Sequence, residues 1–348
     1  MKRRYLAAAL LLTLPAALGW TWLQIVAPGA RMTESAQAFL KTLDEEQRKT
    51  VLLPYDTPQR VGWHFIPKAE RKGLQLKHMN EAQRAAADAL LRSCLSAAGH
   101  GKATRILTVE TLLAEHETNQ QGGNIRDPER YYFTLFGEPT EKGRWGLSIE
   151  GHHLSLNFVV SEGQLVATTP QFFATNPAEI KNAILDDFPV GTRVLGREET
   201  LAFELVASLD KEQRAAAVIA EKAPAEIRAA GEPQSPQEPP VGIDADDLNV
   251  EQRTLLHALI QEYADAMPPT IAKARMAEIE EAGIQKVKFA WAGAEKPGVG
   301  HYYRVEGPTF VIELVNTQHD AAGTPANHVH ALWPDPRGDF DLPVKTEE

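Results

Sequence analysis

Cysteine is almost absent from this sequence. Cys94 is the only one in 348 residues, which excludes an intramolecular disulfide bond. Its helical neighbours are leucines (Leu90, Leu91 and Leu95), a pattern that predicts a buried, structural thiol and not a nucleophile. Stability must then come from an ordinary apolar core, for which a hydrophobic content of 43% is sufficient.

The motifs of several enzyme classes are missing as well. There is no Gly-x-Ser-x-Gly elbow, no Gly-x-Gly-x-x-Gly or P-loop fingerprint, and no His-Glu-x-x-His pair. The chain also lacks an excess of basic residues, because 47 acidic and 36 basic side chains give a net charge of -11. We therefore expect no nucleotide cofactor and no nucleic-acid partner, whose phosphates would require clustered Lys and Arg.

Charge is absent from residues 5–30, which follow the basic residues Lys2, Arg3 and Arg4. This pattern is typical of a secretory signal, and its apolar part is also long enough to span a bilayer as a helix. We therefore predict that residues 1–30 are a signal peptide or an N-terminal membrane anchor and that the fold begins near Met32. A small-residue cleavage pattern is present at Ala36-Gln-Ala38. The expected location is periplasmic, extracellular or membrane-anchored facing outward, with membrane contact only through this segment if it is not cleaved.

Two stretches of the remaining sequence, residues 145–158 and 301–314, resemble each other. Each is typical of a strand, a Glu-Gly turn and a second strand. Four segments also share a capping-box signature, in which Asp or Asn is followed three residues later by Gln; the cap residues are Asp44, Asn80, Asp210 and Asn249. They form two pairs, and a long amphipathic helix and an antiparallel meander follow each pair. We therefore predict an α+β fold of two pseudo-repeats, residues 32–208 and 209–345.

Strands are expected where alternating apolar residues lie between turns rich in Gly, Pro or Asn. The expected strands are Tyr131–Phe136, Gly143–Ile149, His152–Ser161, Leu165–Thr168, Lys286–Trp291, His301–Val305, Thr309–Asn316 and His328–Leu332. Residues 195–208 are expected to form a helix that joins the halves. The proline-rich residues 223–247 are expected to form a flexible or extended surface loop.

Alternation along the echoed strands predicts one polar row in each half. The rows are His153, Ser155 and Asn157, and Thr309, Val311 and Glu313. His152 points to the opposite face of its strand. If the halves pack about a pseudo-twofold axis, the two rows face each other across a cleft between two sheets.

The strongest single motif is Asn327-His328-Val329-His330. Two histidines at i and i+2 on a strand project to the same side and can chelate one cation. We hypothesise that His328 and His330 bind one divalent transition metal (zinc, copper or iron), with Glu313 and His153 as further ligands. The hypothesis places four further residues along the cleft, namely Asn157, His152, Asn327 and Thr309. It also includes carboxylates that could orient the imidazoles, namely Asp335, Asp339 and Asp341. The alternative is that these histidines hydrogen-bond to the backbone and bind no metal.

Two interpretations of Trp63-His64-Phe65-Ile66-Pro67 and the following Arg71 stay open. The aromatic, histidine and arginine side chains line a pocket, or Trp63 and Phe65 pin an ordered loop against the core.

Several stretches of the sequence resemble a known family. They are Trp63–Pro67 with Arg71 and Gly73-Leu74, Arg126–Phe133 with Phe136–Pro139, Trp145–Phe158, Thr169–Phe173 with Asn176–Ala178, Gly191–Leu195 with Glu198-Glu199, Tyr302–Arg304 with Gly307–Glu313, Asn316–Gln318, Ala326–His330, and Trp333 with Asp339-Phe340. On these residues the sequence is similar to the uncharacterised family catalogued as domain of unknown function 3500. A longer loop at His319–Pro325 departs from the family pattern and bears on how Glu313 pairs with His328. The resemblance implies an exported protein and no established activity, so it assigns no catalytic residue.

The leading functional hypothesis is an exported protein of unknown activity with a metal-binding site in a cleft between the two halves. If the protein is an enzyme, it would use a metal-activated water or an open-site redox metal on an unknown small-molecule or envelope substrate. Two other classes compete with it, a non-catalytic extracytoplasmic ligand-binding module and a structural envelope protein. Stoichiometric metal that is lost with His328 and His330 would favour the enzyme.

Overall fold

The computed structural model of the protein describes residues 27–116, 126–182 and 188–344. The segment expected to act as an export signal or anchor lies almost wholly outside the described residues, as does the C-terminal tail 345–348. No helix within the described ranges is long and apolar enough to cross a membrane.

The packed structure begins earlier than the expected start at Met32. Helix α1 (Pro28–Thr42) starts with a proline in its first turn, and Met32, Ala36 and Phe39 are completely buried along it. The backbone at Gly29 lies so close to Gly163 that a Cβ atom there would be 2.4 Å from the carbonyl oxygen of Gly163. The expected segment 1–30 is therefore too long at its C-terminal end, because residues 28–30 belong to the fold.

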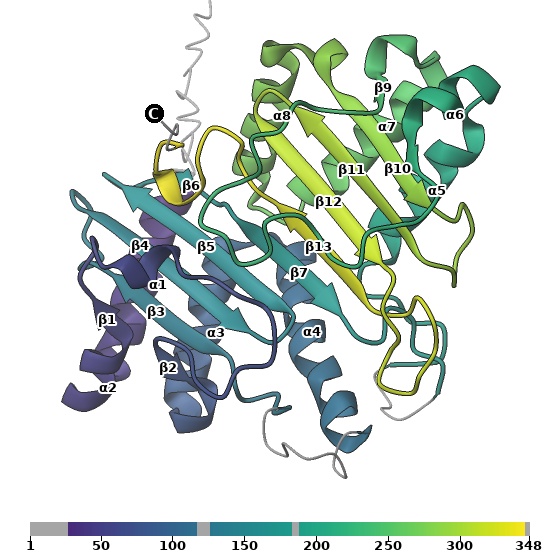
Figure 1. Ribbon diagram of the computed structural model, residues 1–348. Coiled ribbons are helices and arrows are strands. Elements are labelled where there is room, and N and C mark those ends of the chain that lie inside the picture. Colours follow the sequence, from purple (N-terminus) through teal and green to yellow (C-terminus); the bar gives the residue numbers. More distant parts are fainter. Residues whose placement is uncertain (1–26, 117–125, 183–187, 345–348) are drawn as a thin grey trace, which may run out of the picture.

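One mixed sheet of thirteen strands runs through the described chain (Figure 1). Its main order is β1 (Leu52–Leu53), β3 (Tyr132–Phe136), β4 (Arg144–Gly151), β5 (Leu154–Ser161), β7 (Gln171–Thr175), β13 (Val329–Trp333), β12 (Phe310–Asn316), β11 (His301–Gly307), β10 (Lys288–Gly293) and β8 (Val218–Ala220). The short strands β2 (Leu74–Gln75), β6 (Gln164–Ala167) and β9 (Ile243–Asp244) pair with β3, β5 and β10. Neighbours are antiparallel except at the two ends, where β1 pairs with β3 and β8 with β10 in parallel.

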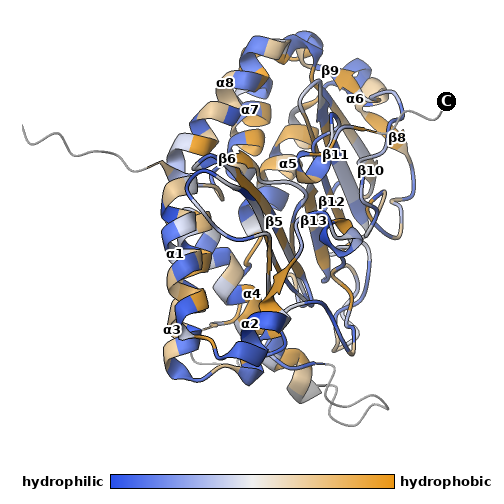
Figure 2. Ribbon diagram, turned by 90° about the vertical axis from the view of Figure 1, so that its left-hand side faces the viewer, coloured by the Kyte–Doolittle hydropathy of each residue, from blue (hydrophilic) through white to orange (hydrophobic). Residues whose placement is uncertain are grey.

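The long helices lie on one face of this sheet (Figure 2). The α-helices are α1, α2 (Glu45–Val51), α3 (Glu81–Cys94), α4 (Ala97–His116), α5 (Gly196–Ser208), α6 (Lys211–Ala217), α7 (Val250–Ala264) and α8 (Pro269–Gly283). Single 3-10 turns occur at η1 (Pro58–Val61), η2 (Leu76–His78), η3 (Ala245–Asp247), η4 (Ile284–Lys286) and η5 (Asp339–Asp341). The predicted α+β class is confirmed.

All four predicted capping boxes are present, at the starts of α2, α3, α6 and α7. In each pair the two glutamines of the boxes also bond to each other. The Nε2 of Gln83 donates to Oε1 of Gln47 at 2.7 Å, and the Nε2 of Gln252 donates to Oε1 of Gln213 at 2.8 Å. The shared signature therefore starts two helices and holds their ends together.

The two halves meet where β7 pairs antiparallel with β13. Each half contains two helices, two short strands, two more helices and then the meander. Helix α5, expected as a connector, packs on α7 as α1 packs on α3. Both halves share one sheet and one main core, which makes them parts of a single body. The common order of elements is what an internal repeat requires, and the repeat itself stays a prediction.

The eight expected strands are present with shifted ends, as β3 to β6 and β10 to β13. Strand β7 was not expected, nor were the very short strands β1, β2, β8 and β9. The helices α1, α4 and α8 were also not expected. In particular, the long helix predicted after Asn80 ends at Cys94, and α4 begins as a separate helix at Ala97.

The face of the sheet opposite the helices carries a smaller apolar cluster that includes Phe172, Tyr302 and Leu332. Two irregular segments cross this face, and we call them the first strap (residues 54–73) and the second strap (residues 221–242). Trp63 and Phe65 of the first strap pack on this cluster, and the ring of Phe65 stacks on Phe172 with centroids 4.1 Å apart. The second strap belongs to the segment expected to be a flexible or extended loop. It is extended, but it is packed against the sheet, because its Ala223 and Ile227 are buried in the same cluster.

Candidate metal centre

Three of the predicted histidines meet at one end of the central strands. The pairing of Gly151 with Leu154 leaves His152 and His153 as the two turn residues of the β4–β5 hairpin. His153 adopts a left-handed backbone with φ 64°, so the expectation that both histidines lie on a strand and point to opposite faces is wrong. The turn instead stacks their rings, with centroids 3.5 Å apart.

Strand β13 supplies the other two imidazoles. His328 directly precedes β13, and His330 lies in β13 opposite Ala174 of β7. The backbone N–H of Ala174 donates to the carbonyl of His153 at 2.9 Å, which ties the hairpin turn to β7. Strand β7 lies between the hairpin turn and β13. Its Ala174 has only a methyl side chain opposite His330, which leaves room for the imidazoles to approach each other.

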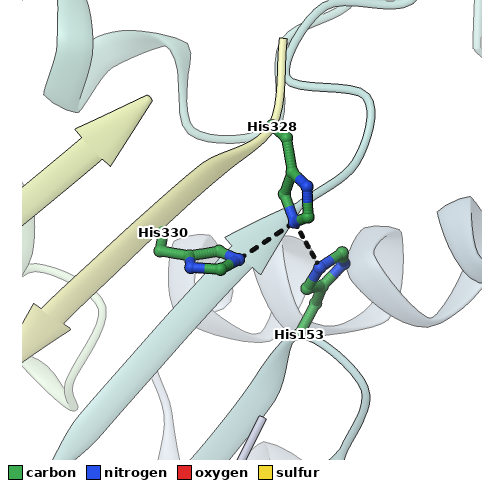
Figure 3. A group of neighbouring side chains, drawn as sticks. All are labelled: His153, His328 and His330. Atoms are coloured by element: carbon green, nitrogen blue, oxygen red, sulfur yellow. Dashed lines mark hydrogen bonds between the residues drawn. The ribbon is translucent and has the colours of Figure 1, made fainter. Parts of the chain in front are cut away.

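The Nε2 atoms of His153, His328 and His330 converge on one point (Figure 3). The Nε2 of His328 lies 2.8 Å from Nε2 of His153 and 2.9 Å from Nε2 of His330. His153 and His330 are buried, and His328 is half-buried. Three imidazoles on a tetrahedral ion, with metal–nitrogen bonds of about 2.0–2.1 Å, would have their nitrogens roughly 3.3 Å apart. Small side-chain shifts would therefore suffice to admit an ion.

Burial keeps the imidazoles of His153 and His328 in the neutral form that binds metals. It lowers the pKa of His153 well below its usual 6.5, and the neighbouring His152 and His328 lower it further. Burial also lowers the pKa of His328 to about 3, with His330 and Arg126 adding to the effect. The neutral imidazoles of His153 and His328 can donate lone pairs to a cation.

A carboxylate orients His330. Its Nδ1 lies 2.7 Å from Oε1 and 2.9 Å from Oε2 of Glu226, a residue of the second strap. A neutral imidazole has one N–H, and the carboxylate places it on Nδ1, so Nε2 presents its lone pair to the centre. The ring of Phe65 from the first strap packs edge-on against His330 at 4.9 Å. Both straps therefore hold this ligand in place.

His152 has a different role from the other three histidines. Its Nδ1 lies 2.6 Å from Oε2 of Glu110 on α4, and its Nε2 lies 2.7 Å from Nη1 of Arg126. Glu110 is buried, and it forms with His152 and His153 a second group whose ligand atoms lie within 4.8 Å of one another. The guanidinium of Arg126 beside this carboxylate–imidazole pair can stabilise negative charge next to the three-histidine group.

Glu313 does not join the histidines, although it was expected as a ligand. Its Oε1 accepts from Nε of Arg228 at 2.7 Å, and its Oε2 accepts from the backbone N–H of Arg228 and from Tyr302, both at 3.0 Å. Burial raises the pKa of Glu313 against the opposing effect of Arg228. This carboxylate anchors the second strap to the sheet.

The two predicted polar rows lie side by side on the strap face of one sheet, not across a cleft between two sheets. Cross-strand pairing runs from Ser155 through Phe172 and Leu332 to Glu313, so these side chains share a face. Asn157 lies on that face but bonds to Ser148 and to the carbonyl of Pro170. It does not contact the histidines.

Asn327 is next to His328 in the chain, but its side chain does not bond to the histidines. It bonds instead to the backbone of Glu179 and to the carboxylate of Asp320, which connects two loops. The loop residue Asn176 instead approaches His328, with its Nδ2 3.4 Å from Nδ1 of that ring.

The remaining predicted residues lie elsewhere. Thr309, Asp335 and Asp341 line a separate cavity of about 640 Å³ between α8, β6 and the C-terminal segment. Asp335 pairs with Arg337, and Asp339 accepts from the backbone N–H of Asp335 at 2.9 Å. Neither carboxylate orients an imidazole, because the chain turns away from the centre after β13.

Glu110, Arg126 and Glu226 were missed by the sequence analysis. Glu110 lies on a helix that was not expected, and Glu226 lies in the segment expected to be a flexible loop. Glu110 contacts His152 and Glu226 contacts His330 only because the fold brings distant segments together, which a local sequence pattern cannot predict. Arg126 had one signal, since it opens a stretch that carries the family resemblance.

Replacing Arg228 by alanine is expected to destabilise the fold by about 3 kcal/mol, because it leaves the carboxylate of Glu313 buried without its cation. The double variant Arg228→Ala/Glu313→Gln should recover much of this loss, and the exposed control Arg197→Ala should change little. Denaturant unfolding measures all three. A loss below about 0.5 kcal/mol in Arg228→Ala would contradict the anchoring role of Glu313.

Asp339 is expected to make stability fall as pH rises. Burial raises its pKa from 3.8 to about 7, against hydrogen bonds from Asp335 and Thr169. Between these two values the unfolded chain has lost a proton that the native chain keeps, so the free energy of unfolding falls by up to about 1.4 kcal/mol per pH unit. Asp339→Asn removes this dependence. Unfolding of both proteins from pH 4 to 8 tests it, and a constant difference between them would contradict it.

Comparison with known proteins gives one match. The family described as Protein of unknown function (DUF3500) matches residues 26–342. No curated protein and no solved structure matches the chain significantly. The family description assigns no activity and no role to the histidines. The match covers nearly the whole sequence, and the chain belongs to the DUF3500 family, as its resemblance predicted.

Proposed function

We propose that His153, His328 and His330 bind one transition-metal ion and that the protein is a metal-dependent enzyme acting through an activated water. The observation that carries this proposal is the convergence of three Nε2 atoms, 2.8 and 2.9 Å apart along the cluster, from two separate strand ends. Imidazole ligands suit zinc, copper and iron. Three protein ligands also leave a coordination position open, as catalytic sites require.

The surroundings support a metal more than a hydrogen-bonded histidine cluster. With the proton of His330 held on Nδ1 by Glu226, the Nε2 of His328 can donate to one neighbouring nitrogen but not to both. One of the two short nitrogen–nitrogen contacts would then lack a hydrogen bond. A cation at the meeting point satisfies all three lone pairs.

The chemistry that such an ion supplies is the lowering of the pKa of a bound water toward neutrality. The chain contributes the groups that handle charge around it. Glu110 holds the imidazole of His152 against the ring of His153. Arg126, beside His152, can hold negative charge that develops on a substrate. This arrangement fits hydrolysis or hydration.

Metal content tests the proposal directly. We expect about one metal ion per chain in the parent protein purified without an affinity tag, and little in His330→Ala, which removes one of three ligands. The exposed His319→Ala is the matched control and should keep its metal. Glu226→Gln should weaken metal affinity by about 10- to 100-fold, because it removes the group that orients His330. Glu313→Gln should not.

Elemental analysis and metal titration provide the measurement. No metal in the parent after reconstitution with zinc, copper, iron and manganese would contradict the proposal. So would equal metal content in the parent and His330→Ala. A metal-free protein would turn attention to the non-catalytic binding module.

We also propose that the protein is exported, with residues preceding α1 acting as a signal peptide or a membrane anchor. The basic start and the charge-free run support this assignment. If the segment is cleaved, we expect cleavage at or before Pro28, because a cut after Ala38 would remove the buried Met32 and Ala36 from the core. Fractionation of cells and the mass of the exported chain test both points. Recovery only in the cytosol, or a chain beginning after Ala38, would contradict them.

A further inference from the structure

A second site lies on the strap face next to the metal centre. It is a pocket of about 410 Å³ between the first strap and β4, lined by His64, Lys68, Arg71, Lys72 and Glu150 among others. Its size is within the range of small-molecule sites. Trp63 and Phe65 hold the strap on the apolar cluster and do not line this pocket, whereas His64 and Arg71 do.

Positive charge dominates this pocket in a chain whose net charge is -11. Lys72 pairs with Glu150 at 2.5 Å, and Arg71 lies 4.0 Å from the other oxygen of the same carboxylate. The side chains of Arg71, Lys72 and Glu150 are only 4, 7 and 3% exposed. Lys68 makes no ion pair with any residue in the described part of the chain. The pocket therefore has three cationic side chains, and only two carboxylates even when the exposed Glu70 is counted with Glu150.

The buried cations retain donors for a ligand. The ammonium of Lys72 has three N–H groups, and it uses two of them on Glu150 and on the carbonyl of Gly62. Arg71 has five N–H groups and donates to the carbonyls of His64 and Ile66. These backbone contacts fix the guanidinium in place and leave donors unused. A fixed guanidinium beside an ammonium is suited to a carboxylate or phosphate group.

Two consecutive residues of the first strap contact the pocket and the metal centre. His64 lines the pocket, while the next residue, Phe65, packs against His330 and accepts from the backbone N–H of His153. Glu150 at the base of the pocket belongs to the same hairpin as the ligand His153. One ligand could therefore be held by the pocket and reach the centre.

We infer that this pocket binds an anionic group, a carboxylate or a phosphate, of the substrate on which the metal centre acts. The inference rests on the proposed metal-dependent function, whose substrate class it narrows. It assigns Lys68, Arg71 and Lys72 to substrate binding and not to the chemical step.

Calorimetric titration of metal-free protein with inorganic phosphate, and separately with malonate, tests the pocket. Lys68 is exposed, so Lys68→Glu should leave the fold intact, and it should weaken anion binding by about tenfold or more through the reversed charge. Lys142→Glu makes the same change in net charge beyond the opposite end of β4 and should have little effect. The stronger of the two probes identifies the anion type. No binding of either probe, or equal affinity in the two lysine variants, would overturn the inference.

The visible spectrum of cobalt-loaded protein tests the link to the centre. The stronger probe should change this spectrum in the parent and much less in Lys68→Glu at the same concentration. An unchanged spectrum in the parent, or an equal change in Lys68→Glu, would overturn the assignment to the metal centre's substrate. Failure of the proposed function is seen separately, as a protein that takes up no metal. Metal-free His330→Ala should bind the anion like the parent.

Discussion

The antiparallel pairing of β7 with β13 is the contact on which the rest of the molecule depends. It joins the two halves into one sheet and sets His330 opposite Ala174. The same strand β7 holds the His152–His153 turn through the bond from Ala174 to the carbonyl of His153. A slip of one residue in this pairing would turn His330 to the helix face and abolish the cluster. The candidate centre is therefore a product of backbone register at the seam, and neither half contains it alone.

The two faces of the sheet have separate tasks. The helix face holds the main apolar core, which is continuous across both halves. The strap face buries carboxylates that pair with cations of the two straps. Glu150 pairs with Lys72 of the first strap, and Glu306 pairs with Arg228 of the second strap. These glutamates belong to the two Glu-Gly turns that resemble each other in the sequence. The two turns differ in the residues that follow, which are His152-His153 in the first and Pro308-Thr309 in the second.

Features with a local cause could be predicted from the sequence. The four helix starts follow from a cap residue and a glutamine within one turn, and the meander strands follow from alternation between turn residues. Strand β7 was missed because it is a five-residue stretch between Pro170 and Pro177, too short for alternation to be evident, although its paired phenylalanines favour a strand. His328 and His330 were recognised from their spacing and His153 from the echo. Glu313 was expected beside the histidines, but the same echo could not report that Arg228, far away in the chain, bonds to both of its oxygens. The contacts of Glu226 and Glu110 arise only from tertiary packing.

The central claim is that three imidazoles from the seam of one sheet bind a single metal ion. A crystal structure of the metal-loaded protein, with anomalous difference maps recorded at the absorption edge of the bound element, tests it most directly. The account predicts one peak about 2.0–2.2 Å from the Nε2 atoms of His153, His328 and His330, with Glu226 still on Nδ1 of His330. A peak at other residues, or three histidines hydrogen-bonded to each other with no peak between them, would contradict it.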